Sequence, residues 1–214
     1  MKPKDLKIPC KWENRHPVLL DKFLFIPSHY DRHSEYDISS FEKIFDNNNP
    51  INIEYCSGNG QWIVDHAKNN LNTNWVAVEK KFDRARKIWV KLHNMQIKNL
   101  LVVYGDGLTF SKYYLKDSSV STFFIHFPDP WPKLKHKKNR IISDEFVNQL
   151  SRILVLNGEG VIVSDDFPTI ENTIDHMLKN LSFKSFFEHP YYQEKIEKYG
   201  NSFFEDLWRE KNRS

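Results

Sequence analysis

The chain has 214 residues, of which 40% are hydrophobic and 28% are charged, and its formal net charge is +3. This composition is ordinary for a soluble globular protein, and the length predicts one compact domain with a short leader. No stretch approaches the roughly 20 apolar residues that span a bilayer, and the N-terminus has no apolar core long enough for a signal peptide. We therefore expect a cytoplasmic protein without a membrane partner.

Few residues in the chain are suited to a disulfide framework or a metal site. Cys10 and Cys56 are too few and too separated for either. The nine histidines show neither an HxH nor an HExxH spacing. We therefore expect two free thiols and no metal.

Residues 1–35 are rich in Pro, Lys, Arg and His and show no clear periodicity, which predicts an extended basic leader that orders on a partner. Within it, Trp12 is an aromatic ring suited to stacking on a base, and Arg15 and Arg32 are candidate contacts to a polyanion. We assign residues 36–214 to one domain.

Beyond the leader, short apolar runs alternate with helical patterns. The expected strands are residues 51–55, 75–79, 100–104, 121–127 and 160–164, with two edge strands at 183–187 and 203–208. The expected helices are residues 38–45, 61–69, 83–95, 169–181, and one that begins at Ser143 and is closed by residues 157–158. Apolar strands that alternate with helices predict a doubly wound α/β fold, with a mostly parallel sheet of about seven strands and helices on both faces.

Polar side chains follow every central strand of this expected sheet. They are residues 54–60, Glu79, Asp106, Asp129 and residues 165–166. In a doubly wound sheet the ligand lies outside the carboxyl ends of the strands. We therefore expect these acids to converge on one rim.

The first of these loops has features of a nucleoside cofactor site. Gly58 and Gly60 let the backbone approach a ligand closely, and Glu79 is placed to accept hydrogen bonds from ribose hydroxyls. The dinucleotide fingerprint needs a further glycine at position 63, where this chain has Ile63. A carboxylate at Glu54 suits the cationic groups of S-adenosylmethionine. Asp106 is placed to accept from an adenine amino group, so we favour S-adenosylmethionine over NAD.

The segment FPDPWPKLKHKKNR, residues 127–140, carries the most specific signal. Asp129 lies between two prolines, which restrict its backbone, and Trp131 follows. A dense run of cationic and polar residues comes next: Lys133, Lys135, His136, Lys137, Lys138, Asn139 and Arg140. An acid at a strand end beside a phosphate-binding patch is the layout expected of an enzyme that modifies nucleic acid.

With these motifs, the chain resembles the bacterial tRNA (guanine-N7-)-methyltransferases, which are Rossmann-like class I enzymes. The resemblance runs from about residue 52 to 205, and FPDPWPK is its most specific element. It implies that Glu54, Gly58, Gly60, Glu79, Asp106 and Asp129 bind S-adenosylmethionine, and that Asp129 is catalytic. It also implies that Lys133, Asp166 and the element Ser202, Phe203, Phe204 and Glu205 bind the substrate, and that residues 135–140 bind RNA.

The sequence departs from the family pattern at three places. Cys56 replaces the usual first glycine of the cofactor loop, Ser202 replaces a threonine, and the final antiparallel strand of many relatives is in doubt here. The guanine N7 carries a lone pair in the neutral base, so the reaction needs positioning and electrostatics more than a general base. Asp129, Asp166 or Glu205 is expected to accept from the N1–H and N2–H₂ groups, which adenine lacks.

Two alternatives stay open. An exocyclic-amine methyltransferase usually has two consecutive prolines before the aromatic residue, whereas Asp129 here is followed by one. A catalytically silent RNA-binding module on the same fold would not need acids at every strand end. A nicotinamide-dependent dehydrogenase is disfavoured by the missing glycines. The expected partner is tRNA, and the choice between monomer and homodimer is undecided.

Overall fold

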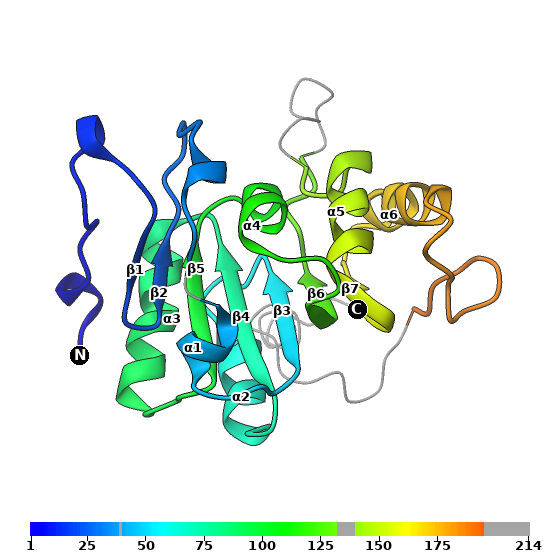
Figure 1. The fold of residues 1–214 in the computed structure, drawn as a ribbon. Coiled ribbons are helices and arrows are strands. Elements are labelled where there is room, and N and C mark those ends of the chain that lie inside the picture. The colour runs from blue at the N-terminus through cyan, green and yellow to red at the C-terminus, as the bar shows by residue number, and fades with distance from the viewer. Residues whose placement is uncertain (39, 132–139, 195–214) are drawn as a thin grey trace.

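The computed structural model describes residues 1–38, 40–131 and 140–194, which form a sheet with helices on both faces (Figure 1). The strands are β1 (Val18–Leu20), β2 (Phe23–Phe25), β3 (Ile51–Tyr55), β4 (Asn74–Glu79), β5 (Leu100–Tyr104), β6 (Val120–His126) and β7 (Leu154–Val163). The helices are α1 (Phe41–Phe45), α2 (Gln61–Asn69), α3 (Phe82–Asn94), α4 (Gly107–Tyr114), α5 (Asp144–Ile153) and α6 (Phe167–Lys179), with short 3-10 turns η1 (Pro3–Asp5), η2 (Trp12–Asn14) and η3 (His33–Glu35).

Within the described residues, the sheet has seven strands in the order β1-β2-β5-β4-β3-β6-β7, and all their pairings are parallel except that of β1 with β2. This confirms the doubly wound fold and the four predicted strands from β3 to β6, whose bounds differ from the prediction by at most one residue at either end. The chain reverses its direction of winding between β3 and β6. The crevice at such a switch point is where doubly wound sheets bind ligands.

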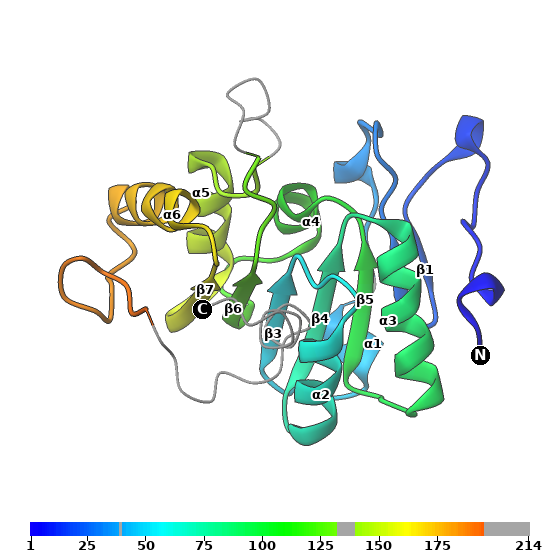
Figure 2. The same ribbon diagram turned by 180° about the vertical axis from the view of Figure 1, so that it is seen from behind.

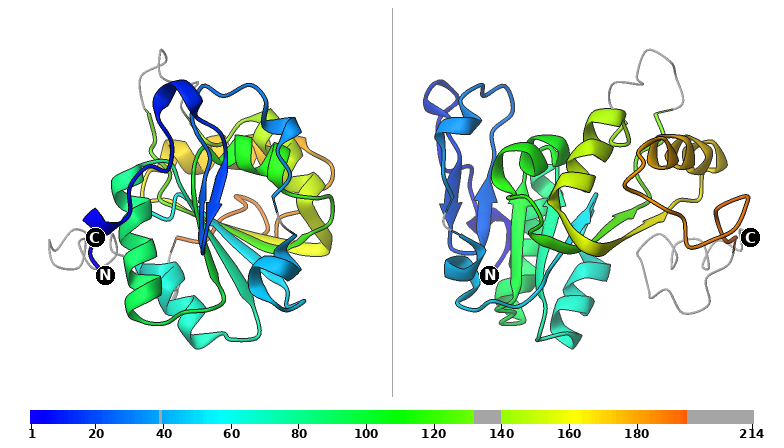
Figure 3. Two further views of the ribbon diagram at one scale, coloured as in Figure 1. Left: turned by 60° about the vertical axis from the view of Figure 1, so that its left-hand side comes forward. Right: turned by 45° about the vertical axis from the view of Figure 1, so that its right-hand side comes forward.

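Residues 18–20 and 23–25, which the sequence analysis assigned to the basic leader, form two strands of the sheet. Phe23, Leu24 and Phe25 are buried, and β2 pairs in parallel with β5. Their apolar side chains belong to the cores on both faces of the sheet, whereas an extended leader would leave them in water. Figure 3 shows β1 and β2, in blue, at one edge of the sheet. A three-residue apolar run is too short to show periodicity in the sequence.

Further differences lie toward the C-terminus. Residues 183–187 form no strand, and residues 203–208 lie outside the described part of the chain. The helix capped by Ser143 ends at Ile153 and not at residues 157–158, because β7 begins at Leu154. Helix α4 was not predicted, because it follows β5 after only two residues and its two faces differ little in hydrophobicity.

Each face of the sheet has its own apolar core, because successive strand residues point to opposite sides. On one face, Ile53 and Tyr55 of β3 pack with α4 and α5. On the other face, Trp75 and Ala77 of β4 pack with α2 and α3. Helices α1 and α4 lie in front of the sheet in Figure 1, and α2 and α3 lie in front in Figure 2. No helix in the described ranges is long and apolar enough to cross a membrane.

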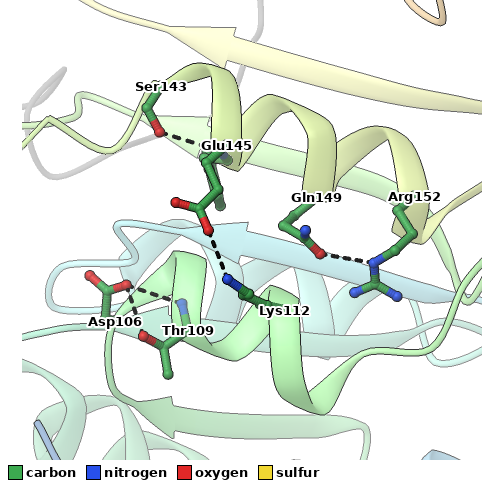
Figure 4. A network of polar contacts seen from close by, with 8 residues as sticks. Asp106, Thr109, Lys112, Ser143, Glu145, Gln149 and Arg152 are labelled. Carbon is green, nitrogen blue, oxygen red and sulfur yellow. Dashed lines mark hydrogen bonds and ion pairs between the residues drawn. The ribbon is translucent and has the colours of Figure 1, made fainter. Parts of the chain in front are cut away.

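A polar network fixes α4 against α5 beside the carboxyl edge of the sheet (Figure 4). Lys112 of α4 pairs with Glu145 of α5 at 2.9 Å. Ser143 caps α5 by accepting from the Phe146 N–H, as the sequence predicted. Asp106 caps α4 in the same way through Thr109. The loops that carry Asp106 and Ser143 are therefore held by the two helix starts.

The N-terminal cations that were predicted to contact a polyanion make contacts within the chain. The Arg15 guanidinium donates to the carbonyls of Trp12, Ser28 and His29 and lies 4.0 Å from the Trp12 ring centroid. Arg32 pairs with Glu35 in η3. These two cations hold local turns, although the Trp12 ring remains exposed.

Candidate active site

The loop between β3 and α2 bends sharply at the carboxyl edge of the sheet. Cys56, Gly58 and Gly60 have φ values of +61°, +56° and +71°. A Cβ on Gly60 would lie 2.6 Å from the Ile88 side chain, so only glycine fits there. Cys56, at the position where the family pattern has glycine, adopts a left-handed backbone of the kind that glycine favours.

Glu79, at the end of β4, is tied to this loop. Its Oε2 accepts from the Gly58 N–H at 2.8 Å, and its Oε1 accepts from the Lys81 N–H at 2.7 Å. Burial raises the pKa of Glu79, although the two backbone hydrogen bonds and Arg84 oppose the shift. Each carboxylate oxygen has a second acceptor position, so Glu79 is held in place while it remains able to bind hydroxyl groups.

Glu54, near the end of β3, pairs with His126, the last residue of β6. Their exposed fractions are 2% and 6%, and His126 Nδ1 lies 2.6 Å from Glu54 Oε1. Glu54 Oε2 is buried and has no hydrogen-bond partner within the described residues. A buried carboxylate oxygen without a donor is costly. It therefore marks a place for a ligand that donates hydrogen bonds or carries positive charge.

Asp106, after β5, has both of its carboxylate oxygens engaged. Oδ1 accepts from the N–H and the hydroxyl of Thr109, and Oδ2 lies 3.2 Å from Lys80 Nζ. The carboxylate is nevertheless partly exposed, so it stays accessible at the rim. The structure gives Asp106 a capping role that the sequence reasoning had not assigned to it.

The predicted acids converge on the β3–α2 loop, as the electrostatics of Cys56 show. Burial raises the pKa of the Cys56 thiol, and nearby negative charges raise it further. These charges are the carboxylates of Glu79, Asp129, Glu54 and Asp106. The four acids therefore lie near enough to this loop at the carboxyl edge for their charges to act on Cys56, and the thiol is kept neutral.

Asp129 lies on an irregular turn directly after β6. Phe127 and Trp131, on either side of the turn, have φ values of +45° and +44°, and Asp129 itself is exposed. The Arg140 guanidinium donates to the carbonyls of Pro130 at 3.1 Å and Trp131 at 3.2 Å. The sequence grouped Arg140 with the RNA-binding residues, whereas the structure engages it with the backbone of this turn.

Asp129 and Asp166 open on the same pocket, which measures about 210 Å³. Its lining residues are Pro128, Asp129, Pro130, Arg140, Ile141, Ile142, Asp166, Pro168, Thr169 and Asn172. Asp166 caps α6 through Oδ2, which accepts from the N–H and the hydroxyl of Thr169. The cap orients the Asp166 carboxylate, and its Oδ1 keeps its acceptor capacity.

Thr169 and Asn172 were not predicted to contribute to this region, and His126 was not predicted to pair with Glu54. Glu54 pairs in register with Phe124, so His126, two residues on, lies on the same face of the sheet. A register estimate for β3 and β6 would have revealed the Glu54–His126 pair. The predicted residues Lys133, Lys135, His136, Lys137, Lys138, Asn139, Ser202, Phe203, Phe204 and Glu205 lie outside the described residues.

The known proteins to which this chain is similar are methyltransferases. A family model described as "Putative methyltransferase" matches residues 48–214. A tRNA (guanine-N(7)-)-methyltransferase of Chlamydia caviae is 46% identical over 99% of this chain and 93% of its own length. One of Oenococcus oeni is 30% identical over 81% of this chain and 73% of its own length. Among solved structures, a geranyl diphosphate C-methyltransferase from Streptomyces coelicolor has a TM-score of 0.49 and 11% identity, covering 62% of this chain and 51% of its own.

Proposed function

Since the chain belongs to the tRNA (guanine-N(7)-)-methyltransferase family, we propose that it transfers a methyl group from S-adenosylmethionine to N7 of a guanine in tRNA. One observation carries the assignment of the site. Asp129 lines the pocket that contains Asp166, and its charge also acts on Cys56 in the β3–α2 loop. A residue in that place can contact both a cofactor and a base. Because tRNA is the substrate, we place the protein in the cytoplasm.

The residues of the loop fit the cofactor. Glu54 Oε2, which is buried and receives no hydrogen bond from the part of the chain that the structure describes, suits the cationic ammonium group. Glu79, anchored by two backbone N–H groups, accepts from the ribose hydroxyls, and Asp106 accepts from the adenine amino group. Gly58 and Gly60 allow a close approach of the backbone. When bound, S-adenosylmethionine supplies an electrophilic methyl group.

The chain needs no general base for this reaction. The guanine N7 has an in-plane lone pair in the neutral base, so Asp129 acts by position and charge. The methylated purine is cationic, and a carboxylate about 4 Å from a unit positive charge is worth about 4 kcal/mol at an effective dielectric of about 20, before desolvation is deducted. Asp129 and Asp166 also accept from the guanine N1–H and N2–H₂ groups, which selects guanine over adenine.

The basic residues from Lys133 to Lys138 hold the phosphates of the tRNA, and the element from Ser202 to Glu205 helps to hold the guanine. If the four lysines of this segment meet phosphates, log K for tRNA falls against log salt with a slope of about −3, at about 0.7 per contact. A slope near zero would contradict this part of the proposal.

A single assay separates the proposed function from its alternatives. Unmodified tRNA is incubated with the protein and S-adenosylmethionine carrying a radioactive methyl group, and is then digested to nucleosides. The proposal predicts label in 7-methylguanosine. Label in a methylated adenine or cytosine would favour an exocyclic-amine enzyme, and cofactor binding without transfer would favour a silent RNA-binding module.

A further inference from the structure

Arg140 ends the basic segment, so its position in the sequence suggests a phosphate contact. The structure places its side chain elsewhere. Nε donates to the Pro130 carbonyl at 3.1 Å, and Nη2 donates to the Trp131 carbonyl at 3.2 Å. The planar guanidinium presents several donors in a fixed geometry, which suits two successive carbonyl groups.

The turn that receives these hydrogen bonds has an unfavourable backbone. Neither Phe127 nor Trp131 is glycine, yet both have positive φ. Such residues cost about 1–3 kcal/mol each and persist only when their surroundings hold them. Before Asp129, the Phe127 N–H donates to the Val163 carbonyl at 2.8 Å, which ties the turn to β7. After Asp129, Arg140 supplies the corresponding restraint.

We propose that Arg140 is a positioning residue that fixes the Asp129 turn, and that it is not one of the phosphate contacts. The proposal rests on the catalytic role assigned above to Asp129. Asp129 is exposed and no hydrogen bond to its carboxylate is seen within the described residues, so its direction depends on the backbone that carries it. Arg140 binds that backbone one and two residues further on and lines the same pocket.

The two roles predict different responses to salt. A guanidinium engaged with neutral carbonyls releases no counterions when tRNA binds, so its removal leaves the salt slope unchanged. Removal of a phosphate contact makes the slope shallower by about 0.7 and weakens tRNA binding. A misplaced Asp129 instead lowers the rate of methyl transfer at saturating tRNA, since displacement by about 1 Å can cost about 10²-fold.

Arg140→Gln and Arg140→Lys test the proposal, with Lys137→Gln as the comparison for a phosphate contact. For Arg140→Gln we expect kcat to fall about 10²-fold, with the Kd for tRNA and its salt slope as in wild type. Arg140→Lys should be intermediate, because one ammonium replaces the two-pronged donor. If Arg140→Gln fails to fold, the kcat of Arg140→Lys is the deciding measurement. A normal kcat in either folded variant, with or without a shallower salt slope, would overturn the proposal.

A double variant shows whether Arg140 acts through Asp129. In an Asp129→Asn background, Arg140→Gln should slow methyl transfer by less than about threefold, because residues that act as a unit are not additive. A further loss of about 10²-fold would show that Arg140 acts elsewhere and would overturn the proposal. Wild-type activity of Asp129→Asn alone would instead refute the role of Asp129, so the two failures are distinguishable.

Discussion

His126 Nδ1 lies 2.6 Å from Glu54 Oε1 in a buried contact between the ends of β6 and β3. A carboxylate only accepts hydrogen bonds, so Nδ1 carries the hydrogen. The Trp62 ring packs against the imidazole with its centroid 4.5 Å away. One Glu54 oxygen is thereby fixed by the protein, while the other has no hydrogen-bond partner among the described residues, which suits the proposed contact with the cofactor.

Removal of the His126 donor should weaken cofactor binding. A hydrogen bond to a charged group contributes about 1.5–3 kcal/mol, so His126→Phe should raise the Kd for S-adenosylmethionine about 10- to 100-fold. Isothermal titration calorimetry measures this change. His126→Asn keeps an N–H donor near the same place and serves as the matched control. Equal affinities for His126→Phe and wild type would show that the pair does not prepare Glu54.

Substitution by alanine should lower the free energy of unfolding by different amounts at Gly58 and Gly60 of the β3–α2 loop. Gly58→Ala and Gly60→Ala each place a Cβ on a left-handed backbone, at a cost of about 1–2 kcal/mol. Gly60→Ala also forces the Cβ to within 2.6 Å of Ile88, whereas the nearest atom to a Cβ on Gly58 lies 3.9 Å away. Overpacking adds about 1–3 kcal/mol to the loss of unfolding free energy for Gly60→Ala. Urea denaturation compares the two variants, and equal losses would contradict the clash.

His33 should make stability depend on pH. Its Nδ1 lies 2.6 Å from the Tyr114 hydroxyl, and its ring stacks on Tyr113. Burial lowers the pKa of His33 below its ordinary value of 6.5. The unfolded state therefore binds the proton first, and unfolding free energy is lost as pH falls from about 6.5 toward the lower folded pKa, by at most about 1.4 kcal/mol per pH unit.

The comparison of wild type with His33→Gln isolates this contribution. Denaturation between pH 8 and pH 5 should show a smaller loss of stability in the variant than in wild type. Exposed His189 provides the control, since His189→Gln should keep the wild-type pH dependence. The same pH dependence in His33→Gln and wild type would show that His33 is not responsible.

The central sheet was predictable because its strands are short, largely apolar runs that are followed within a few residues by glycine or acidic residues. β3 and β5 match their predicted bounds residue by residue. β1 and β2 were missed because their three residues are too few to establish a period, although burial of Phe23 to Phe25 is what fixes them in the sheet. Phe183 to Phe187 have an apolar pattern, yet they form no strand.

The rim of acids was predictable for a simple physical reason, since parallel strands end at one edge. The side chains that form hydrogen bonds with those acids could not be predicted in the same way. The Glu54–His126 pair depends on strand register, and the Arg140 contacts depend on how a loop folds back on itself. Charge clustering in the sequence indicates a phosphate-binding patch but cannot show that Arg140, at the end of this patch, donates to the backbone.

Asp129 is the residue on which the proposed chemistry depends, so the most direct test measures methyl transfer in single turnover. Asp129→Ala should abolish formation of 7-methylguanosine while thermal unfolding stays near that of wild type, because Asp129 is exposed. The matched control is Asp165→Ala, which removes an exposed carboxylate that does not line the pocket and should keep the wild-type rate. A fully active Asp129→Ala protein would contradict the account.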